Sequence, residues 1–542
     1  MSSRVPRIAL AALVAAASPA FDQAPAPPPG ESPIGMVARG VRVDVIAEDE
    51  DGQPVTDLRS EELVLTDEGR REEIVAFTGA GDESVPEAPK PLPRNTFTNR
   101  LELLTGRAPT VTAILFDGLN TPMANQEFAK RQIIGFLRQI PMGSPVSLYA
   151  LGRGPHVLQD LTVDPEPLIR ALEQYRGDTR VEPGAAPLPT SDAGLQHLDA
   201  WFQELSVDLV EHYAQDRALR TARSLVAIAN HLERVPGRKN LIWVSGSFPV
   251  RWVTRDSVPL PGVPTSGDQS FWPEIERAAR ALAGANLAVY PVDARGLRST
   301  GEYAPGQASI SRQARFADRA GFETMEALAE RTGGRAFVNS NDLGRAFRQA
   351  VDDSRAAYIL GYEPSHDEWK GEFRRIEVKT TRPGVRLRHR RGYFAQPRVP
   401  ADDWYRRGVL EAATWSPMDA TRLGVTVLAT PSPDGPLTLA LRLHAPDVLL
   451  RPAGGRWRGL LDVWLIQLGP GDELLDTVSH VADLSLTPAD HGRIMRTNEI
   501  VLMERLKPRE GTVLLRILVR DVTSGALGSV SIPLDRVERD AS

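Results

Sequence analysis

The sequence predicts an α/β protein built around a doubly wound, mostly parallel sheet, flanked by β-sandwich segments and followed by a C-terminal β-sandwich domain. Three observations support this fold class. Between residues 110 and 356, short runs that are apolar throughout alternate with segments of helical periodicity, as in a parallel sheet covered on both faces. On either side of this region, apolar residues recur at every second position. The 542 residues also exceed what a single hydrophobic core can organise.

The first 20 residues are typical of a secretory signal peptide. Arg4 and Arg7 precede the apolar run IALAALVAAA, and small residues follow up to Ala20. The apolar run is shorter than the roughly 20 residues that a membrane-spanning helix needs. We therefore expect export to the periplasm or the extracellular space, with cleavage near Ala20 and no transmembrane segment in the mature chain.

A spacer, a β-segment and a linker are predicted next. Residues 21–35 are rich in proline, which favours an extended spacer. Residues 36–79 begin with the alternating run VRVDVIA and hold a few short strands, too little to bury a stable core. We expect this incomplete, immunoglobulin-like segment to take strands from elsewhere in the chain. Residues 80–109 hold several prolines and many polar residues, which predicts a linker.

Residues 110–356 are predicted as one α/β domain. The run VTAILF is expected to be its first strand, because it is apolar throughout and ends abruptly at Asp117. Apolar residues at helical spacing predict a helix from Asn125 to Ile140. A tight glycine turn joins the runs PVSLYAL and HVLQDL, which predicts an antiparallel pair at the sheet edge. The later strands NLIWVS and LAVYPVDA end near Ser245 and Asp293.

The apolar period returns to two after residue 356. Residues 357–396 contain three predicted strands, which we expect to complete the N-terminal β-segment. The α/β domain would then be inserted in a discontinuous sandwich. Residues 397–542 are predicted as a separate β-sandwich domain, because turns such as PSPDG and RPAGG separate alternating strands there.

The composition excludes several classes of function. The chain has no cysteine, which rules out disulfides, thiol catalysis, thiolate zinc sites and iron–sulfur clusters. The nine histidines are scattered and no two lie three or four positions apart, so a helical two-histidine metal site is not expected. The formal net charge of −6 is small for this length and does not indicate a nucleic-acid partner.

The middle of the chain resembles the von Willebrand factor type A (VWA) fold, and more closely the VWFA-related secreted proteins of acidobacteria. The residues that carry the resemblance are VTAILFDGLNTP, GRKNLIWVSGSFP, LAVYPVDARGL and LAERTGGRAFV, together with the strands after residue 356 and the opening β-segment. The resemblance covers roughly residues 38 to 395. It implies a VWA-like, Rossmann-type sheet with a binding face at the carboxyl ends of the strands.

The VWA resemblance also implies a metal-ion-dependent adhesion site, in which a D-x-S-x-S run and residues of later loops hold Mg²⁺. Asp117 and Thr121 match the first and last positions of that run, whereas Leu119 stands in the middle and cannot ligate. The run Ser245-Gly246-Ser247 stands where an Asp followed by Gly is usual. The expected site is therefore degenerate, with Asp117, Thr121, Ser245 and Ser247 as candidate Mg²⁺ ligands. In the alternative interpretation, Asp117 caps the following helix or bonds loop amides without a metal.

Three further residues are candidates for the binding face. Asn120 follows the first strand and can make local hydrogen bonds, and Asp293 ends the fifth strand. Asp293 either adds negative charge near Asp117 or fixes its own Asp-Ala-Arg-Gly turn. Trp252 lies in a long loop rich in Pro, Ser and Gly, where an aromatic side chain would be available for binding.

The sequence favours an exported, non-enzymatic binding or adhesion-type protein of the cell envelope. Its partner would be another protein or a cell-envelope component. The first alternative is a metal-free scaffold that assembles envelope subunits. A hydrolase with an unrecognised site is less favoured, because the run around Ser245 lacks the flanking glycines of a G-x-S-x-G nucleophile turn.

Overall fold

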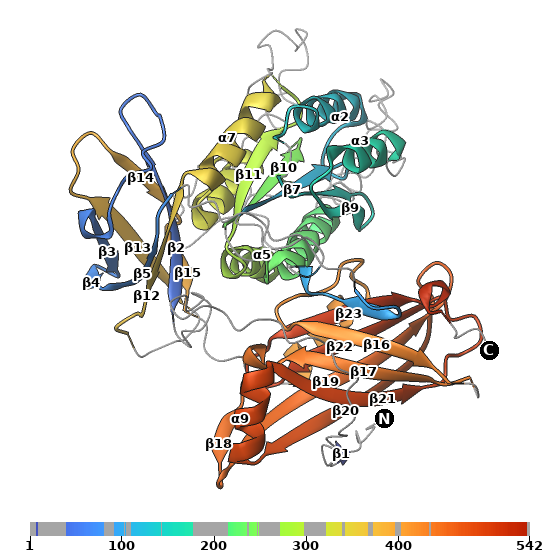
Figure 1. Cartoon of the computed structure of the whole chain (residues 1–542). Coiled ribbons are helices and arrows are strands. Elements are labelled where there is room, and N and C mark those ends of the chain that lie inside the picture. Colours follow the sequence, from blue (N-terminus) through green and yellow to red (C-terminus); the bar gives the residue numbers. More distant parts are fainter. Residues whose placement is uncertain are drawn as a thin grey trace, which may run out of the picture.

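The structure is a computed structural model with three regions: an N-terminal β-domain, a central α/β domain and a C-terminal β-domain (Figure 1). Among the described residues, no helix is long and apolar enough to cross a membrane. The structure describes residues 7–8, 40–80, 92–101, 103, 110–141, 144–176, 215–235, 238–246, 248, 272–296, 321–338, 342–366, 372–395, 403–432 and 435–538.

A five-stranded sheet forms the middle of the central domain, in the order β11-β10-β7-β8-β9. All its neighbours are parallel except β8 and β9, the antiparallel edge pair that the tight turn predicts. The prediction of a mixed α/β fold with a parallel sheet is confirmed, and the strand order is compatible with a VWA-like fold. The strands are β7 (Thr110–Asp117), β8 (Val146–Leu151), β9 (Pro155–Thr162), β10 (Arg238–Ser245) and β11 (Leu287–Asp293).

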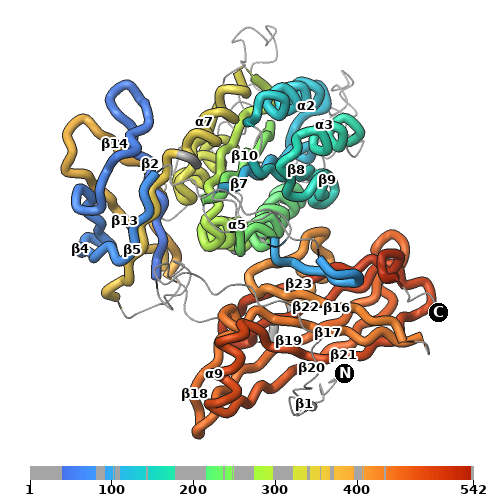
Figure 2. Tube along the Cα trace, in the orientation of Figure 1, coloured from blue at the N-terminus to red at the C-terminus, as the bar shows by residue number. Residues whose placement is uncertain are grey.

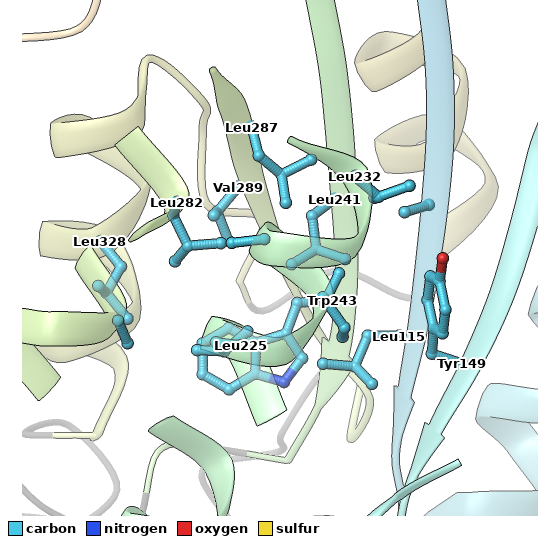
Figure 3. Close-up of a cluster of buried hydrophobic side chains, with 14 of the residues drawn as sticks. Leu115, Tyr149, Leu225, Leu232, Leu241, Trp243, Leu282, Leu287, Val289 and Leu328 are labelled. Carbon is cyan, nitrogen blue, oxygen red and sulfur yellow. The ribbon is translucent and has the colours of Figure 1, made fainter. Parts of the chain in front are cut away.

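Helices cover both faces of this sheet, which explains why its strands are apolar throughout. On β7, Ile114 and Phe116 belong to one hydrophobic core and Ala113 and Leu115 to another. Figure 3 shows the second core, in which Trp243 lies among aliphatic side chains. The helices are α2 (Met123–Leu137), α3 (Pro165–Gln174), α5 (Trp272–Gly284) and α7 (Leu343–Arg355), with further helical residues at 215–232 and 321–332.

The N-terminal β-domain consists of two four-stranded sheets that share one hydrophobic core. Strands from before and after the central domain alternate within it, since β12 lies between β2 and β5 and β13 pairs with β3. The central domain is therefore inserted between halves of this unit. Its strands are β2 (Val41–Glu48), β3 (Leu63–Asp67), β4 (Arg70–Glu72), β5 (Ile74–Thr78), β12 (Ala357–Tyr362), β13 (Phe373–Thr380), β14 (Arg386–His389) and β15 (Gly392–Phe394).

The C-terminal β-domain also has two sheets around one core, in the orders β1-β20-β19-β22-β23 and β21-β17-β16-β6. Helix α8 packs on one sheet and α9 joins β20 to β21. The elements are α8 (Asp403–Thr414), β16 (Val425–Pro431), β17 (Leu437–His444), β18 (Arg451–Ala453), β19 (Arg456–Leu468), β20 (Leu474–Leu486), α9 (Pro488–Thr497), β21 (Glu499–Leu506), β22 (Leu514–Asp521) and β23 (Leu527–Pro533).

Two strands of this domain come from segments where the sequence predicts none. Strand β6 (Thr96–Thr98) lies within the predicted linker 80–109 and pairs with β16. The order of these residues comes from a distant strand and leaves no local periodicity in the sequence. Strand β1 (Arg7–Ile8), within the predicted signal peptide, pairs in parallel with β20.

Charged side chains that are buried or half-buried join the N-terminal β-domain to the central domain. Asp44 on β2 lies 3.6 Å from Arg238 on β10 and accepts a 2.9 Å hydrogen bond from Asn286. Arg388 on β14 lies 2.5 Å from Asp353 on α7. Removing one partner from such a buried pair leaves an uncompensated charge, so these contacts specify how the two domains dock.

The central domain is also tied to the C-terminal β-domain, beside which it lies in Figure 2. The Thr421 hydroxyl donates a 2.9 Å hydrogen bond to the carbonyl oxygen of His231. The His231 ring contacts the carbonyl oxygen of Asp419 at 2.8 Å. Arg422 and Glu233 form an ion pair at 3.5 Å. The central domain is thus held from both sides by the described residues.

Candidate functional site

The candidate site lies at the carboxyl ends of β7 and β10, which are adjacent and parallel. Phe116 is in register with Val244, so Asp117 and Ser245 follow at the same edge of the sheet. The strand order reverses here, because the chain proceeds from β7 to β8 on one side and from β10 to β11 on the other. Ligands of open α/β sheets bind at such switch points.

The carboxylate of Asp117 is fully buried and accepts four hydrogen bonds from residues that the structure describes. Its Oδ2 atom accepts from the Trp243 indole at 3.0 Å, the Ser245 hydroxyl at 2.8 Å and the Asn120 amide at 2.9 Å. Its Oδ1 atom accepts from the backbone N–H of Asn120 at 3.0 Å. Burial raises the pKa of Asp117, and these four hydrogen bonds offset only part of that rise.

Asn120 extends this network to a neighbouring helix. Its side-chain amide also donates a 2.8 Å hydrogen bond to the Thr221 hydroxyl, which in turn donates to the carbonyl oxygen of Arg217. The Asn120 Oδ1 atom is buried and has no partner within the part of the chain that the structure describes. The loop after β7 is thus fastened to the helix at 215–232 as well as to β10.

The loops after β7 and β10 are in close backbone contact. The Gly246 N–H donates a 3.0 Å hydrogen bond to the Thr121 hydroxyl. A Cβ atom at Gly246 would lie 2.6 Å from the carbonyl oxygen of Asn120, closer than side chains approach backbone atoms. Only glycine fits there without a shift of the backbone. Asp117 bonds a loop amide and does not cap α2, whose first turn has no side-chain cap.

Asp293 lies at the end of the next strand and interacts within its own turn. Its Oδ1 atom accepts hydrogen bonds from the Arg295 backbone at 2.9 Å and from the Arg295 guanidinium at 3.1 Å. The Arg295 guanidinium lies 4.7 Å from the ring centre of Phe322. The charge of Asp293 is therefore balanced locally, which matches the turn-fixing interpretation of this residue.

The structure brings together Asp117, Asn120, Thr121 and Ser245 of the predicted residues. Ser247 and Trp252 lie outside the described residues. Sequence reasoning missed the contact of Trp243 with Asp117. The available signal was its position two residues before Ser245, which places both side chains on one face of β10.

The donor set is a poor fit for a divalent cation. Mg²⁺ takes about six oxygen ligands, whereas Asp117 is engaged by N–H and O–H donors that point at its oxygens. A cation would have to displace the Trp243 and Asn120 N–H groups. Leu119 fills the middle position of the ligand run and is buried. Within the described residues, no group of three His, Asp or Glu side chains could hold a metal ion.

No known family model matches the chain, and no curated protein matches its sequence. Among solved structures, it is similar to an aerotolerance-related membrane protein of Bacteroides fragilis, with 14% identity, 45% of this chain and 98% of that chain covered, and a TM-score of 0.24. It is also similar to a von Willebrand factor type A protein of Catenulispora acidiphila (9% identity, 88% of this chain and 74% of that chain, TM-score 0.23).

A third similar structure holds three N-terminal domains of the type V pili tip protein Mfa5 of Porphyromonas gingivalis. It is 10% identical, with 85% of this chain and 77% of that chain covered, and has a TM-score of 0.24. Scores of this size carry no argument about fold or function. The order and direction of the strands in the central sheet are compatible with a VWA-like fold.

Proposed function

We propose that this chain is an exported, non-enzymatic binding protein whose central domain presents the loops after β7 and β10 to another protein or a cell-envelope component. In this proposal the face acts without a bound metal. Export is supported by the basic and apolar N-terminus, with Arg4 and Arg7 ahead of IALAALVAAA.

The observation that carries the proposal is the four-fold hydrogen bonding of Asp117. Donors from the loop after β7 and from β10 converge on one buried carboxylate. In a VWA-type adhesion site a cation would occupy the position of such donors. Here the N–H groups of Trp243 and Asn120 supply the positive ends of dipoles, so the loops are held in one arrangement without a metal.

A hydrolytic function has weaker support. A serine nucleophile needs a base that accepts its proton and can then return it. The Ser245 hydroxyl donates to Asp117, whose Oδ2 atom already accepts two other hydrogen bonds. Ser245 is also fully buried, which keeps its hydroxyl oxygen away from a substrate.

The alternative is a metal-free envelope scaffold in which the central domain assembles subunits. The connections of the central domain to both β-domains favour this alternative. Strand β6, which pairs within the C-terminal β-domain, precedes β7 in the chain. Strand β12, which pairs within the N-terminal β-domain, follows α7. A domain held at both ends keeps a fixed orientation and suits an assembly role. The two functions differ in whether the face at Asp117 binds a partner.

The test is capture of a partner from envelope extract on the immobilised exported chain, in EDTA and in Mg²⁺. Met123, 49% exposed at the start of α2, lies beside the face, and Met495, 37% exposed on α9, is a matched remote control. We expect equal capture in both buffers, loss in Met123→Glu and retention in Met495→Glu. Glutamate suits the first turn of α2, so the variant should fold. Capture that requires Mg²⁺, or that survives Met123→Glu unchanged, would contradict the proposal.

A further inference from the structure

Strand β21 is the last strand of the four-stranded sheet of the C-terminal β-domain, in a different domain from the face at Asp117 (Figure 1). Within the described residues it pairs only with β17, which lies on one side of it. All eight residues of β21, EIVLMERL, pair with β17 without an irregularity. The other side of residues 499–505 is the β21 edge. An edge of this kind presents backbone N–H and C=O groups that can pair with another strand.

The hydrogen bonds of the sheet show which residues direct their backbone groups to this edge. The Ala445 N–H donates to the carbonyl oxygen of Asn498 at 2.9 Å, one position before β21. The His444 N–H donates to the carbonyl oxygen of Gly424 at 2.8 Å, on the β16 side of β17. Because hydrogen-bonded pairs alternate along an antiparallel ladder, both bonds place the even-numbered residues of β21 toward β17. The residues whose backbone groups point to the edge are Glu499, Val501, Met503 and Arg505.

Two apolar side chains accompany the edge on the outer face of the sheet. Val501 is 50% exposed and Met503 is 51% exposed, whereas Leu502 between them belongs to the hydrophobic core. Side chains alternate along a strand, so Glu499 and Arg505 lie on the same outer face, one at each end. Charges on an edge strand usually oppose pairing. These two have opposite signs and lie equally far from Leu502, so the edge is complementary to its own reversed copy.

The pattern selects one register for a second copy. With a two-fold axis at Leu502, Val501 lies opposite Met503 of the second copy, and Glu499 lies opposite Arg505 of the second copy. An axis at Val501 would set Glu499 against Met503, and an axis at Met503 would set Val501 against Arg505. Only the axis at Leu502 pairs opposite charges and apolar side chains with each other, which is the favourable combination across strands.

Other charged groups near the edge do not prevent this pairing. Glu504 faces the inner side of the sheet and lies 3.2 Å from His480 of β20 in an ion pair. In the two-fold register it would lie opposite Ile500 of the second copy. Glu499 forms a 3.5 Å ion pair with Arg442 of its own chain, and both side chains are exposed. An exposed ion pair contributes little to stability, so Glu499 is available to a second partner.

We propose that two copies of this chain associate through their β21 edges, antiparallel to each other about a two-fold axis at Leu502. Their two four-stranded sheets would then form one continuous sheet. Backbone hydrogen bonds supply affinity, and the charged pairs fix the register. A two-fold contact uses the same surface on both copies and closes as a dimer. The dimer does not involve the loops at Asp117, so either proposal can fail without the other.

A charge exchange in the exported chain tests the register. Sedimentation velocity over a range of concentrations should show a reversible dimer of the wild type. Glu499→Arg and Arg505→Glu each create two like-charge contacts in their own dimers, so each should raise the dissociation constant about tenfold. Mixing the two variants, with one of them fluorescently labelled, restores both opposite-charge pairs. The mixture should therefore form heterodimers with nearly the affinity of the wild-type dimer.

A backbone substitution tests the strand pairing itself. Met503→Pro removes an N–H that points to the edge and is not used by β17, so the variant should fold and remain monomeric. Thermal unfolding checks that it folds, and if it does not, the charge exchange decides alone. A wild type that stays monomeric at every concentration would overturn the proposal. A dimer that tolerates both charge variants or a folded Met503→Pro would do so too, as would variants that fail to associate when mixed.

Discussion

The indole N–H of Trp243 on β10 donates a 3.0 Å hydrogen bond to the carboxylate of Asp117 at the end of β7. Both residues are fully buried, and they come from adjacent parallel strands 126 positions apart in the sequence. With Ser245 and Asn120, the indole completes a set of donors around one carboxylate. Through this arrangement Asp117 holds the loops at the sheet edge together.

Truncation of the Asp117 side chain should lower the unfolding free energy of the protein. Asp117→Ala leaves buried donors of Trp243 and Asn120 without an acceptor, so we expect a loss of about 3 kcal/mol in unfolding free energy. Asp117→Asn keeps the shape and one acceptor oxygen and should cost about 1 kcal/mol. Chemical denaturation of both variants measures the difference. Equal, negligible losses would mean that these hydrogen bonds do not hold the loops.

The raised pKa of Asp117 predicts the sign of a pH effect. A raised folded-state pKa means that the native state binds the proton more tightly, so this group's contribution to stability falls as pH rises from 3.8 through the folded pKa. Wild type should therefore lose stability relative to Asp117→Asn over that window. Unfolding free energies of the two proteins at several pH values between 4 and 7 test this. A difference that grows in favour of wild type with rising pH would contradict it.

His231 predicts a loss of stability in the same direction, with rising pH, but near neutral pH. Its Nδ1 atom faces the carbonyl oxygen of Asp419 at 2.8 Å and its Nε2 atom the Asp160 carboxylate at 3.1 Å, with the Tyr149 ring edge-on at 6.2 Å. Two acceptors require a doubly protonated ring. Burial opposes that charge, but the hydrogen bond and charge of Asp160 outweigh it and raise the pKa of His231.

The stability from His231 should be complete below pH 6.5 and be lost as pH rises through its folded pKa. Unfolding of wild type and His231→Gln between pH 6 and 9 measures this loss. His480→Gln serves as a comparison within the C-terminal β-domain. There Glu504 also raises the pKa of His480, so this variant should show a pH dependence in the same direction. If wild type and His231→Gln respond to pH alike, the ring is neutral and the interpretation fails.

Gly246 should not tolerate a side chain. Gly246→Ala places a methyl group 2.6 Å from the Asn120 carbonyl oxygen, and the resulting shift of the loop should cost about 1–3 kcal/mol. Gly135→Ala is the control, since a Cβ atom at this position within α2 meets nothing within 4 Å. Alanine there should stabilise the helix by about 0.5–1 kcal/mol. Thermal unfolding compares the two, and a neutral Gly246→Ala would show that the loops are not in close contact.

The sequence was sufficient for the central sheet because its strands carry their own signal. The run VTAILF is apolar at every position, as required of a strand buried on both faces, and it corresponds to β7. Strand β6 has no such signal. Its three residues, Thr96 to Thr98, are too few to show an alternating apolar pattern. Their pairing partner, β16, lies more than 300 positions later in the sequence.

The site was predictable in its location but only partly in its chemistry. Asp117 and Ser245 end two apolar runs, and parallel strands bring such ends to one edge. The apolar residues around Trp243 in the sequence indicate a core residue, and its ring does lie in the hydrophobic core. Its N–H direction depends on side-chain packing across two strands, which periodicity does not encode. Contacts such as that of Arg388 with Asp353 are unpredictable from sequence for the same reason.

Titration calorimetry with Mg²⁺ and Mn²⁺, on wild type and on Asp117→Asn, tests the central claim most directly. If the Trp243, Asn120 and Ser245 donors occupy the carboxylate, neither protein should give a saturable heat, because a cation would have to displace those hydrogen bonds. A saturable heat in wild type that Asp117→Asn abolishes would contradict the account and establish Asp117 as a metal ligand.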